Sequence, residues 1–137
     1  MERIRVLVTG AAGKMGQAVM QGVLDDPECE LVGAVDVCLT GNDAGVLLGR
    51  DPIGVTIERD LVQTIRDSRP DVMVEFTQPD TARINIVTAL KMGVYPVVGT
   101  TGLKQEELDE ISSLCETSGL GAFFAPNFAV GAVLMMQ

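Results

Sequence analysis

A glycine-rich segment near the N-terminus has the residue spacing that holds a pyrophosphate. Gly10, Gly13 and Gly16 lie three positions apart in the string VTGAAGKMG, directly after the apolar run Ile4–Val8 and before a helix-like stretch. One glycine allows a tight turn, another lets the backbone approach the phosphates, and another lets helix and strand pack closely. N–H groups at the start of the helix then face the anion. The segment predicts dinucleotide binding, and an ordinary tight connection made of three glycines is the alternative.

An acidic residue follows at the distance that recognition of an adenosine ribose requires. Asp36 stands twenty positions after the last of these glycines, at the end of the apolar run Leu31–Val35. A carboxylate there accepts hydrogen bonds from the ribose hydroxyls and repels a 2′-phosphate. Val37 and Cys38 supply no arginine, so we expect NADH to bind at least as well as NADPH. Lys14 over the adenosine phosphate would admit NADPH, and a solvated cation in the first helical turn is its alternative role.

The elements that position these residues alternate between short apolar runs and amphipathic stretches. Continuous apolar runs are typical of strands that helices cover on both faces. The order of the elements predicts one α/β domain with a doubly wound parallel sheet, the Rossmann dinucleotide-binding fold. The expected strands are Ile4–Val8, Leu31–Val35, Val72–Phe76, Tyr95–Val98 and Ala122–Ala125, with a weaker one at Val55–Ile57. The expected helical faces carry Met15, Val19 and Val23, then Ala82, Ile86 and Leu90, then Leu108, Ile111 and Cys115, and a loop with a helical turn near Ala44–Leu48 fills Gly41 to Gly54.

Composition limits the classes of function. The 137 residues are 47% hydrophobic, which is enough for one globular core. A formal net charge of −9 argues against a nucleic-acid or anionic-membrane surface. The apolar runs are too short to span a membrane and the N-terminus lacks the apolar stretch of a signal peptide, so we expect a cytoplasmic protein.

The residue types that usually bind metals or transfer protons are few. The three cysteines match neither a disulfide framework nor a zinc site, and we expect no metal. Histidine, the side chain that most often transfers protons near neutral pH, is absent from the sequence.

Three further motifs fall where predicted strands end, which is where an open α/β sheet binds ligands. They are FTQP at 76–79, GTTG at 99–102 and APNFAVG at 125–131. Two hydroxyls between two glycines offer polar groups on a backbone that can approach a ligand, and an asparagine with exposed carbonyls suits a nicotinamide carboxamide. Each motif also has an ordinary interpretation: a strand-to-helix turn at Pro79, a threonine cap for a helix near Lys104, and a turn before an apolar helix.

Together and in this order, GAAGKMG, FTQP, GTTG and APNFAVG resemble the 4-hydroxy-tetrahydrodipicolinate (dihydrodipicolinate) reductase family of bacterial lysine, or diaminopimelate, biosynthesis. The resemblance runs from Ile4 to Met136 and includes the intervals between motifs. It implies hydride transfer from NADH or NADPH to a cyclic unsaturated dicarboxylate, with Thr101 reaching the substrate's carboxylate. The cofactor-binding residues that it implies are Gly10, Gly13, Lys14, Met15 and Gly16 at the pyrophosphate, Asp36 at the adenosine ribose, Phe76, Thr77, Gly99 and Thr101 at the nicotinamide, and Ala125, Asn127 and Phe128 at the carboxamide.

The same resemblance implies that the chain is an isolated N-terminal domain. In the family, a substrate domain with a paired-histidine motif and a lysine follows the NFAVG string, so the catalytic residues are expected beyond Gln137. We expect 1–128 to form the NAD(P)-binding domain and 129–137 to begin the connection into a C-terminal substrate and tetramerisation domain. The chain alone is then expected to bind cofactor without turnover, and not to form the homotetramer expected of the intact enzyme.

Other nucleotide-binding classes fit less well. A short-chain dehydrogenase acts through a Tyr-x-x-x-Lys pair, but the one tyrosine is Tyr95 and Gly99 stands four positions on. A P-loop is excluded because Met15, rather than Ser or Thr, follows Lys14. The remaining alternative is a stand-alone, non-catalytic dinucleotide-binding or sensor domain. The absence of a catalytic histidine and the short length favour it, whereas the family motifs in their family order and the apolar C-terminal end weigh against it.

Overall fold

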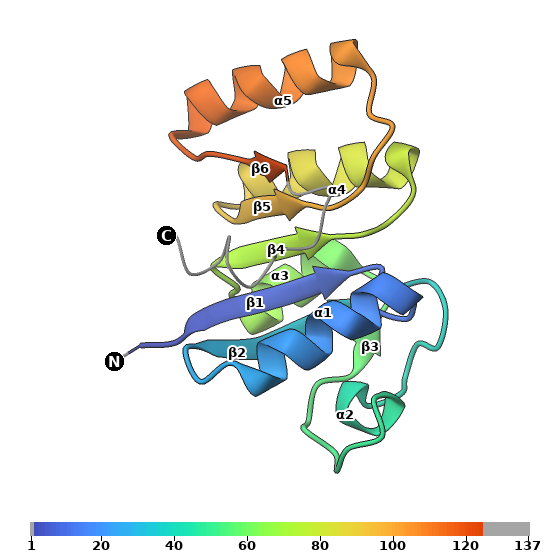
Figure 1. Cartoon of the computed structure of the whole chain (residues 1–137). Helices are drawn as coiled ribbons and strands as arrows, with labels where there is room; N and C mark the ends of the chain where they lie inside the picture. Colours follow the sequence, from blue (N-terminus) through green and yellow to red (C-terminus); the bar gives the residue numbers. More distant parts are fainter. Residues whose placement is uncertain (1, 125–137) are drawn as a thin grey trace.

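Parallel strands and connecting helices alternate along the chain. The computed structural model describes residues 2–124 (Figure 1). Within them the strands are β1 Ile4–Thr9, β2 Cys29–Val35, β3 Ile57–Glu58, β4 Val72–Glu75, β5 Tyr95–Val98 and β6 Phe123–Phe124. The helices are α1 Lys14–Asp25, α2 Ala44–Leu47, α3 Leu61–Ser68, α4 Pro79–Lys91 and α5 Gln105–Ser118.

All neighbouring strands of the sheet are parallel, and their order is β3-β2-β1-β4-β5-β6. The order reverses between β1 and β4, since the chain moves outward from β1 to β3 and then crosses back to β4. In open α/β sheets, ligands bind outside the carboxyl ends of the strands at such a reversal. The predicted doubly wound parallel sheet is confirmed, and the strands begin and end within two residues of their predicted ends.

Alternate residues of the strands bury the two faces of the sheet. Val6 and Val8 of β1 pack with α1 in one cluster, whereas Leu7 between them packs with α3 in another. Figure 1 shows α1 and α3 on opposite sides of β1. Because side chains alternate along a strand, an unbroken apolar run serves both layers at once.

The predicted helical faces are largely correct. Ala82, Ile86 and Leu90 of α4 are all buried, and Ile86 packs in the same cluster as Ile111 of α5. The exception is Met15, which is 37% exposed although it was expected to share the buried face of α1. Met15 lies in the first turn of α1 and lines one of the cavities described below.

Helix α3 was missing from the sequence prediction although its start is signalled. The Asp60 carboxylate caps it by accepting a hydrogen bond from the Gln63 N–H at 3.1 Å. Leu61, Thr64 and Ile65 form its buried face at helical spacing. An N-cap aspartate before apolar residues three and four apart is the usual sign of a helix start.

Among residues 2–124, no helix has the length and apolarity that a bilayer crossing requires.

The contact between α1 and the glycine loop predicts opposite effects for two glycines of one helix. A Cβ at Gly16 would overlap the carbonyl oxygen of Gly10, whereas a Cβ at Gly22 would meet no atom within 4 Å. We expect Gly16→Ala to lower the free energy of unfolding by about 1–3 kcal/mol. The control, Gly22→Ala, should raise it by up to about 1 kcal/mol, because alanine favours the helix. Urea unfolding checks both, and equal effects would contradict this account of Gly16.

Candidate functional site

The glycine loop joins the end of β1 to the start of α1. Gly10 adopts a left-handed backbone conformation (φ 70°), and its carbonyl accepts the Gly13 N–H at 3.1 Å. Gly13 is the N-cap of α1 and forms no side-chain cap. The first N–H groups of a helix have no intrahelical acceptor. In α1 these donors, together with the positive end of the helix dipole, therefore remain available to an anion.

The three glycines differ in what a side chain at each position would contact. A Cβ at Gly10 would overlap the backbone oxygen of Phe76, and one at Gly16 would overlap Gly10 itself. At Gly13 the nearest atom to a built Cβ is the Gly10 oxygen at 3.4 Å, which is ordinary contact. Among the described residues there is room for a Cβ at Gly13, and the missing side chain leaves the helix terminus open to a ligand.

Asp36 lies beside this loop. Its Oδ2 accepts the Ala12 N–H at 2.8 Å, and its Oδ1 accepts the Cys38 N–H at 2.9 Å. Two backbone bonds fix the carboxylate, and each oxygen retains a second lone pair for another donor. The predicted ribose acceptor is thus adjacent to the predicted pyrophosphate loop.

Two adjoining cavities collect most of the predicted site residues. The first, of about 300 Å³, is lined by Gly10, Gly13, Asp36, Phe76 and Thr77 among others. The second, of about 230 Å³, is lined by Met15, Phe76, Thr77, Gly99 and Thr101 among others. The first cavity adjoins the glycine loop and the second adjoins the GTTG segment. Phe76 and Thr77 line both cavities, so the two cavities meet at these residues.

The remaining predicted residues are elsewhere. Lys14 is exposed and lines neither cavity, and Gly16 is buried against the loop. Ala125, Asn127 and Phe128 lie outside the described residues, as do 129–137.

The GTTG segment is tied to the end of β4. The Thr100 hydroxyl donates to the Thr77 carbonyl at 2.9 Å, and a Cβ at Gly99 would overlap the Phe76 ring. The alternative interpretation, that a threonine of this segment caps α5, is wrong. The N-cap is Lys104, whose N–H donates to Glu107 Oε1 at 2.9 Å. Thr100 therefore fixes the segment, and its neighbour Thr101 remains exposed at the cavity.

A fully buried carboxyl group lies beneath this convergence of strand ends. Glu75, the last residue of β4, is 0% exposed. Its Oε1 accepts the Thr77 hydroxyl at 2.6 Å and the Asn85 amide N–H at 2.9 Å, and its Oε2 contacts the Thr9 hydroxyl. These partners come from β1, the FTQP segment and α4. The sequence analysis missed Glu75, although an acid inside the apolar run VMVEF is the signal that would have found it.

Burial favours the protonated form of Glu75. Thr9 Oγ1 lies within hydrogen-bonding distance of both the Val74 carbonyl oxygen, at 3.3 Å, and Glu75 Oε2, yet a hydroxyl carries one proton. The shorter of the two contacts is to Glu75, so the Thr9 hydroxyl donates to Glu75 Oε2. Burial raises the pKa of Glu75 above its ordinary value, against the lowering effect of its hydrogen-bond donors.

A raised pKa in the folded state fixes the sign of a pH effect. The folded protein retains the Glu75 proton over a pH range in which the unfolded chain has lost it. The stabilisation from Glu75 is therefore complete below the ordinary glutamate pKa of about 4.3 and is lost as the pH rises through the raised pKa. Glu75→Gln removes this titration, so the stability of the variant relative to the parent should increase with pH in urea unfolding.

Two variants separate this effect from general charge removal. The exposed Glu116 on α5 supplies the control, because Glu116→Gln should show no comparable pH-dependent difference. Glu75→Ala should lower the free energy of unfolding by about 2–4 kcal/mol in the low-pH range where Glu75 is protonated, since it leaves buried donors without an acceptor. A Glu75→Gln difference that stays constant or falls with pH would refute a protonated Glu75.

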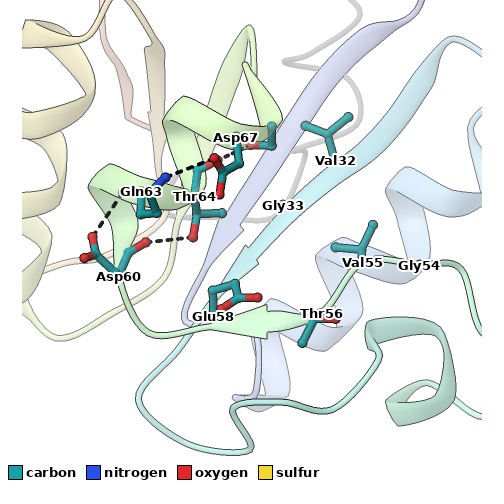
Figure 2. A pocket seen from close by; sticks show the side chains of 11 residues that line it. Val32, Gly33, Gly54, Val55, Thr56, Glu58, Asp60, Gln63, Thr64 and Asp67 are labelled. Carbon is teal, nitrogen blue, oxygen red and sulfur yellow. Dashed lines mark hydrogen bonds between the residues drawn. The ribbon is translucent and has the colours of Figure 1, made fainter.

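A larger cavity lies away from the glycine loop, beside α3. It has a volume of about 380 Å³ and is lined by segments of β2, β3 and α3. Figure 2 shows Asp60, Gln63 and Asp67 linked by hydrogen bonds along α3. The charged residues that line this cavity, Glu58, Asp60 and Asp67, are all acidic. Its electrostatics therefore disfavour a phosphate ligand despite its size.

Within residues 2–124, no three His, Cys, Asp or Glu side chains form a group that could hold a metal.

The strand order, the glycine loop with its uncapped helix and the acid at the end of β2 define a Rossmann dinucleotide-binding domain. A family model described as "Dihydrodipicolinate reductase, N-terminus" matches residues 4–128. The chain therefore belongs to the dihydrodipicolinate reductase family, as the motif resemblance implied.

Individual relatives agree. A 4-hydroxy-tetrahydrodipicolinate reductase of Moorella thermoacetica is 50% identical over 134 residues, which cover 98% of this chain and 50% of the relative. One from Desulfitobacterium hafniense is 46% identical over 138 residues, covering 100% and 52%. Among solved structures, a dipicolinate-bound dihydrodipicolinate reductase from Paenisporosarcina sp. TG-14 has a TM-score of 0.77 at 37% identity, covering 98% and 51%. The chain thus spans about half the length of these relatives.

Proposed function

We propose that this chain is the NAD(P)H-binding part of a 4-hydroxy-tetrahydrodipicolinate reductase, with NADH or NADPH as hydride donor in lysine biosynthesis. The observation that carries the proposal is the pair of adjoining cavities that meet at Phe76 and Thr77, between the glycine loop and the GTTG segment. The names of the relatives supply the reaction. When bound, the reduced nicotinamide supplies the hydride.

The chain's own residues then bind and orient the dinucleotide. The N–H groups at the start of α1, left open by Gly13, hold the pyrophosphate, with Met15 beside it. The Asp36 carboxylate accepts from the adenosine ribose through its free lone pairs. Phe76, Thr77, Gly99 and Thr101 surround the nicotinamide, and Ala125, Asn127 and Phe128 are proposed for its carboxamide on the motif resemblance.

The second cavity has the chemistry for a ring that carries an amide. The Phe76 ring contributes an apolar surface, and the Thr77 and Thr101 hydroxyls add polar groups at its margin. Thr77 is held by its bond to Glu75 and Thr100 by its bond to the Thr77 carbonyl. The side chains are therefore arranged before a ligand arrives, which reduces the entropic cost of binding. We propose that Thr101, exposed at the same cavity, also contacts the substrate carboxylate.

Calorimetric titration with NADH tests the proposal. The chain should bind NADH saturably, and Gly13→Trp should abolish binding because the indole would fill the space at the helix terminus. The matched control is Gly22→Trp on the same helix, whose position faces open space and should leave binding unchanged. Circular dichroism verifies that both variants are folded. Absence of NADH and NADPH binding to the folded parent chain would refute the proposed function.

The isolated polypeptide should bind the cofactor without steady-state turnover of 4-hydroxy-tetrahydrodipicolinate. The sequence has no histidine for proton transfer, and it matches about half of each relative. Loss of NADH absorbance in the presence of the substrate is the measurement, and sustained turnover would contradict the expectation. A reading frame that continues past Gln137 would favour a reductase over a stand-alone binding or sensor domain.

A further inference from the structure

An arginine that follows a different strand shares the cavity of Asp36. Arg59 directly follows β3, and it lines the cavity of about 300 Å³ next to the glycine loop. Its Nη2 donates to the Val37 carbonyl at 3.2 Å. The residues that follow Asp36 in sequence supply no arginine, but the fold brings one to the same cavity from 23 positions further on.

The sheet register, rather than a side-chain rotamer alone, determines this proximity. In the parallel pairing of β2 with β3, Val35 lies opposite Glu58. The pairing continues one step further, because the Asp36 N–H donates to the Glu58 carbonyl at 3.0 Å. The residues that follow each strand, Asp36 and Arg59, therefore leave the sheet side by side.

The charges in this cavity are one anion and one cation. Asp36 and Arg59 are the charged residues among those that line it, and Lys14 is not one of them. The two form no ion pair with each other within 4 Å. Among the described residues, Arg59 donates the single bond to Val37 and has no ion pair, although a guanidinium carries five N–H donors. Arg59 thus has donors available at the edge of the ribose position.

We propose that Arg59 accommodates the 2′-phosphate of NADPH, and that it determines how far this domain accepts NADPH beside NADH. An arginine near the ribose acid performs this task in Rossmann domains, and its planar donors suit a phosphate. Asp36 accepts from the free hydroxyls of NADH, whereas Arg59 offsets its repulsion of the additional phosphate. The inference deepens the proposed function and rests on it.

Paired affinities for the two cofactors test the inference. Arg59→Ala should weaken NADPH binding about tenfold or more, the effect of losing a charge-assisted hydrogen bond, and change NADH affinity less than about twofold. Arg59→Lys should recover part of the NADPH affinity, because it restores the charge without the planar donors. The matched control is Arg66→Ala, an exposed arginine of α3 that lies outside this cavity, which should leave the ratio of the two affinities unchanged.

A second measurement isolates the adenosine half. Adenosine 2′,5′-bisphosphate and adenosine 5′-monophosphate differ by the 2′-phosphate and lack the nicotinamide, so their affinity ratio reports on this cavity alone. Arg59→Ala should lower the affinity for the 2′,5′-bisphosphate relative to that for the 5′-monophosphate. An unchanged ratio in both pairs of ligands would overturn the inference while the proposed function stands. A ratio lost on Lys14→Ala and retained on Arg59→Ala would do the same. If the parent chain binds neither NADH nor NADPH, the proposed function fails, and the inference fails with it.

Discussion

The close approach of two backbones at the ends of β1 and β4 is the constraint on which the rest of the site depends. Gly10 leaves no room for a Cβ beside the Phe76 carbonyl, and Gly99 leaves none beside the Phe76 ring. Three segments that are far apart in the sequence therefore converge on one residue. Their separation is set by van der Waals contact with backbone or with a ring, which yields far less than a flexible side chain does. The glycine loop and the GTTG segment consequently have a fixed distance between them before any ligand binds.

Apolar packing alone would not orient the polar groups where these segments converge. Hydrogen bonds to Glu75 orient them. Its carboxyl group is buried at the end of β4, and β1, the FTQP segment and α4 each contribute a hydrogen-bonding partner. A buried polar group is costly unless its hydrogen bonds are formed, so the network favours one arrangement over near alternatives. Among the described residues, every fully buried side-chain nitrogen and oxygen has a partner. The orientation of the Thr77 hydroxyl at the cavity edge is thus set by its hydrogen bond to the buried Glu75.

The sequence predicted the sheet well because its signal is local. Runs such as Val72–Phe76 are apolar on both faces, and a glycine triplet between a strand and a helix has few interpretations. Residues whose role depends on partners distant in sequence were harder to find. Arg59 approaches Asp36 through strand pairing, and Glu75 contacts Thr9 across 66 positions. Helix α3 is a different case. Its capping aspartate and its apolar spacing are both in the sequence, but the helix has only 8 residues, so the pattern repeats too few times to stand out. Periodicity placed Met15 on one helical face with Val19 and Val23, whereas the motif resemblance placed it at the ligand site, and in the structure it is exposed and lines a cavity.

The strand order also bears on how the chain acquires its structure during synthesis. β1 is made first, yet it lies in the middle of the sheet, and its partner β4 begins at Val72. A nascent chain that has completed β1, α1 and β2 holds the glycine loop but exposes one edge of β1. Distant pairings of this kind form slowly, and an unpaired edge is prone to association with other chains. Val6, Leu7 and Val8 are buried in the finished domain, so until β4 is joined this edge presents one of its most apolar segments. When β4 pairs with β1, it covers this exposed edge. The same pairing brings Phe76, which follows β4, against Gly10 and so joins two sides of the cavity next to the glycine loop.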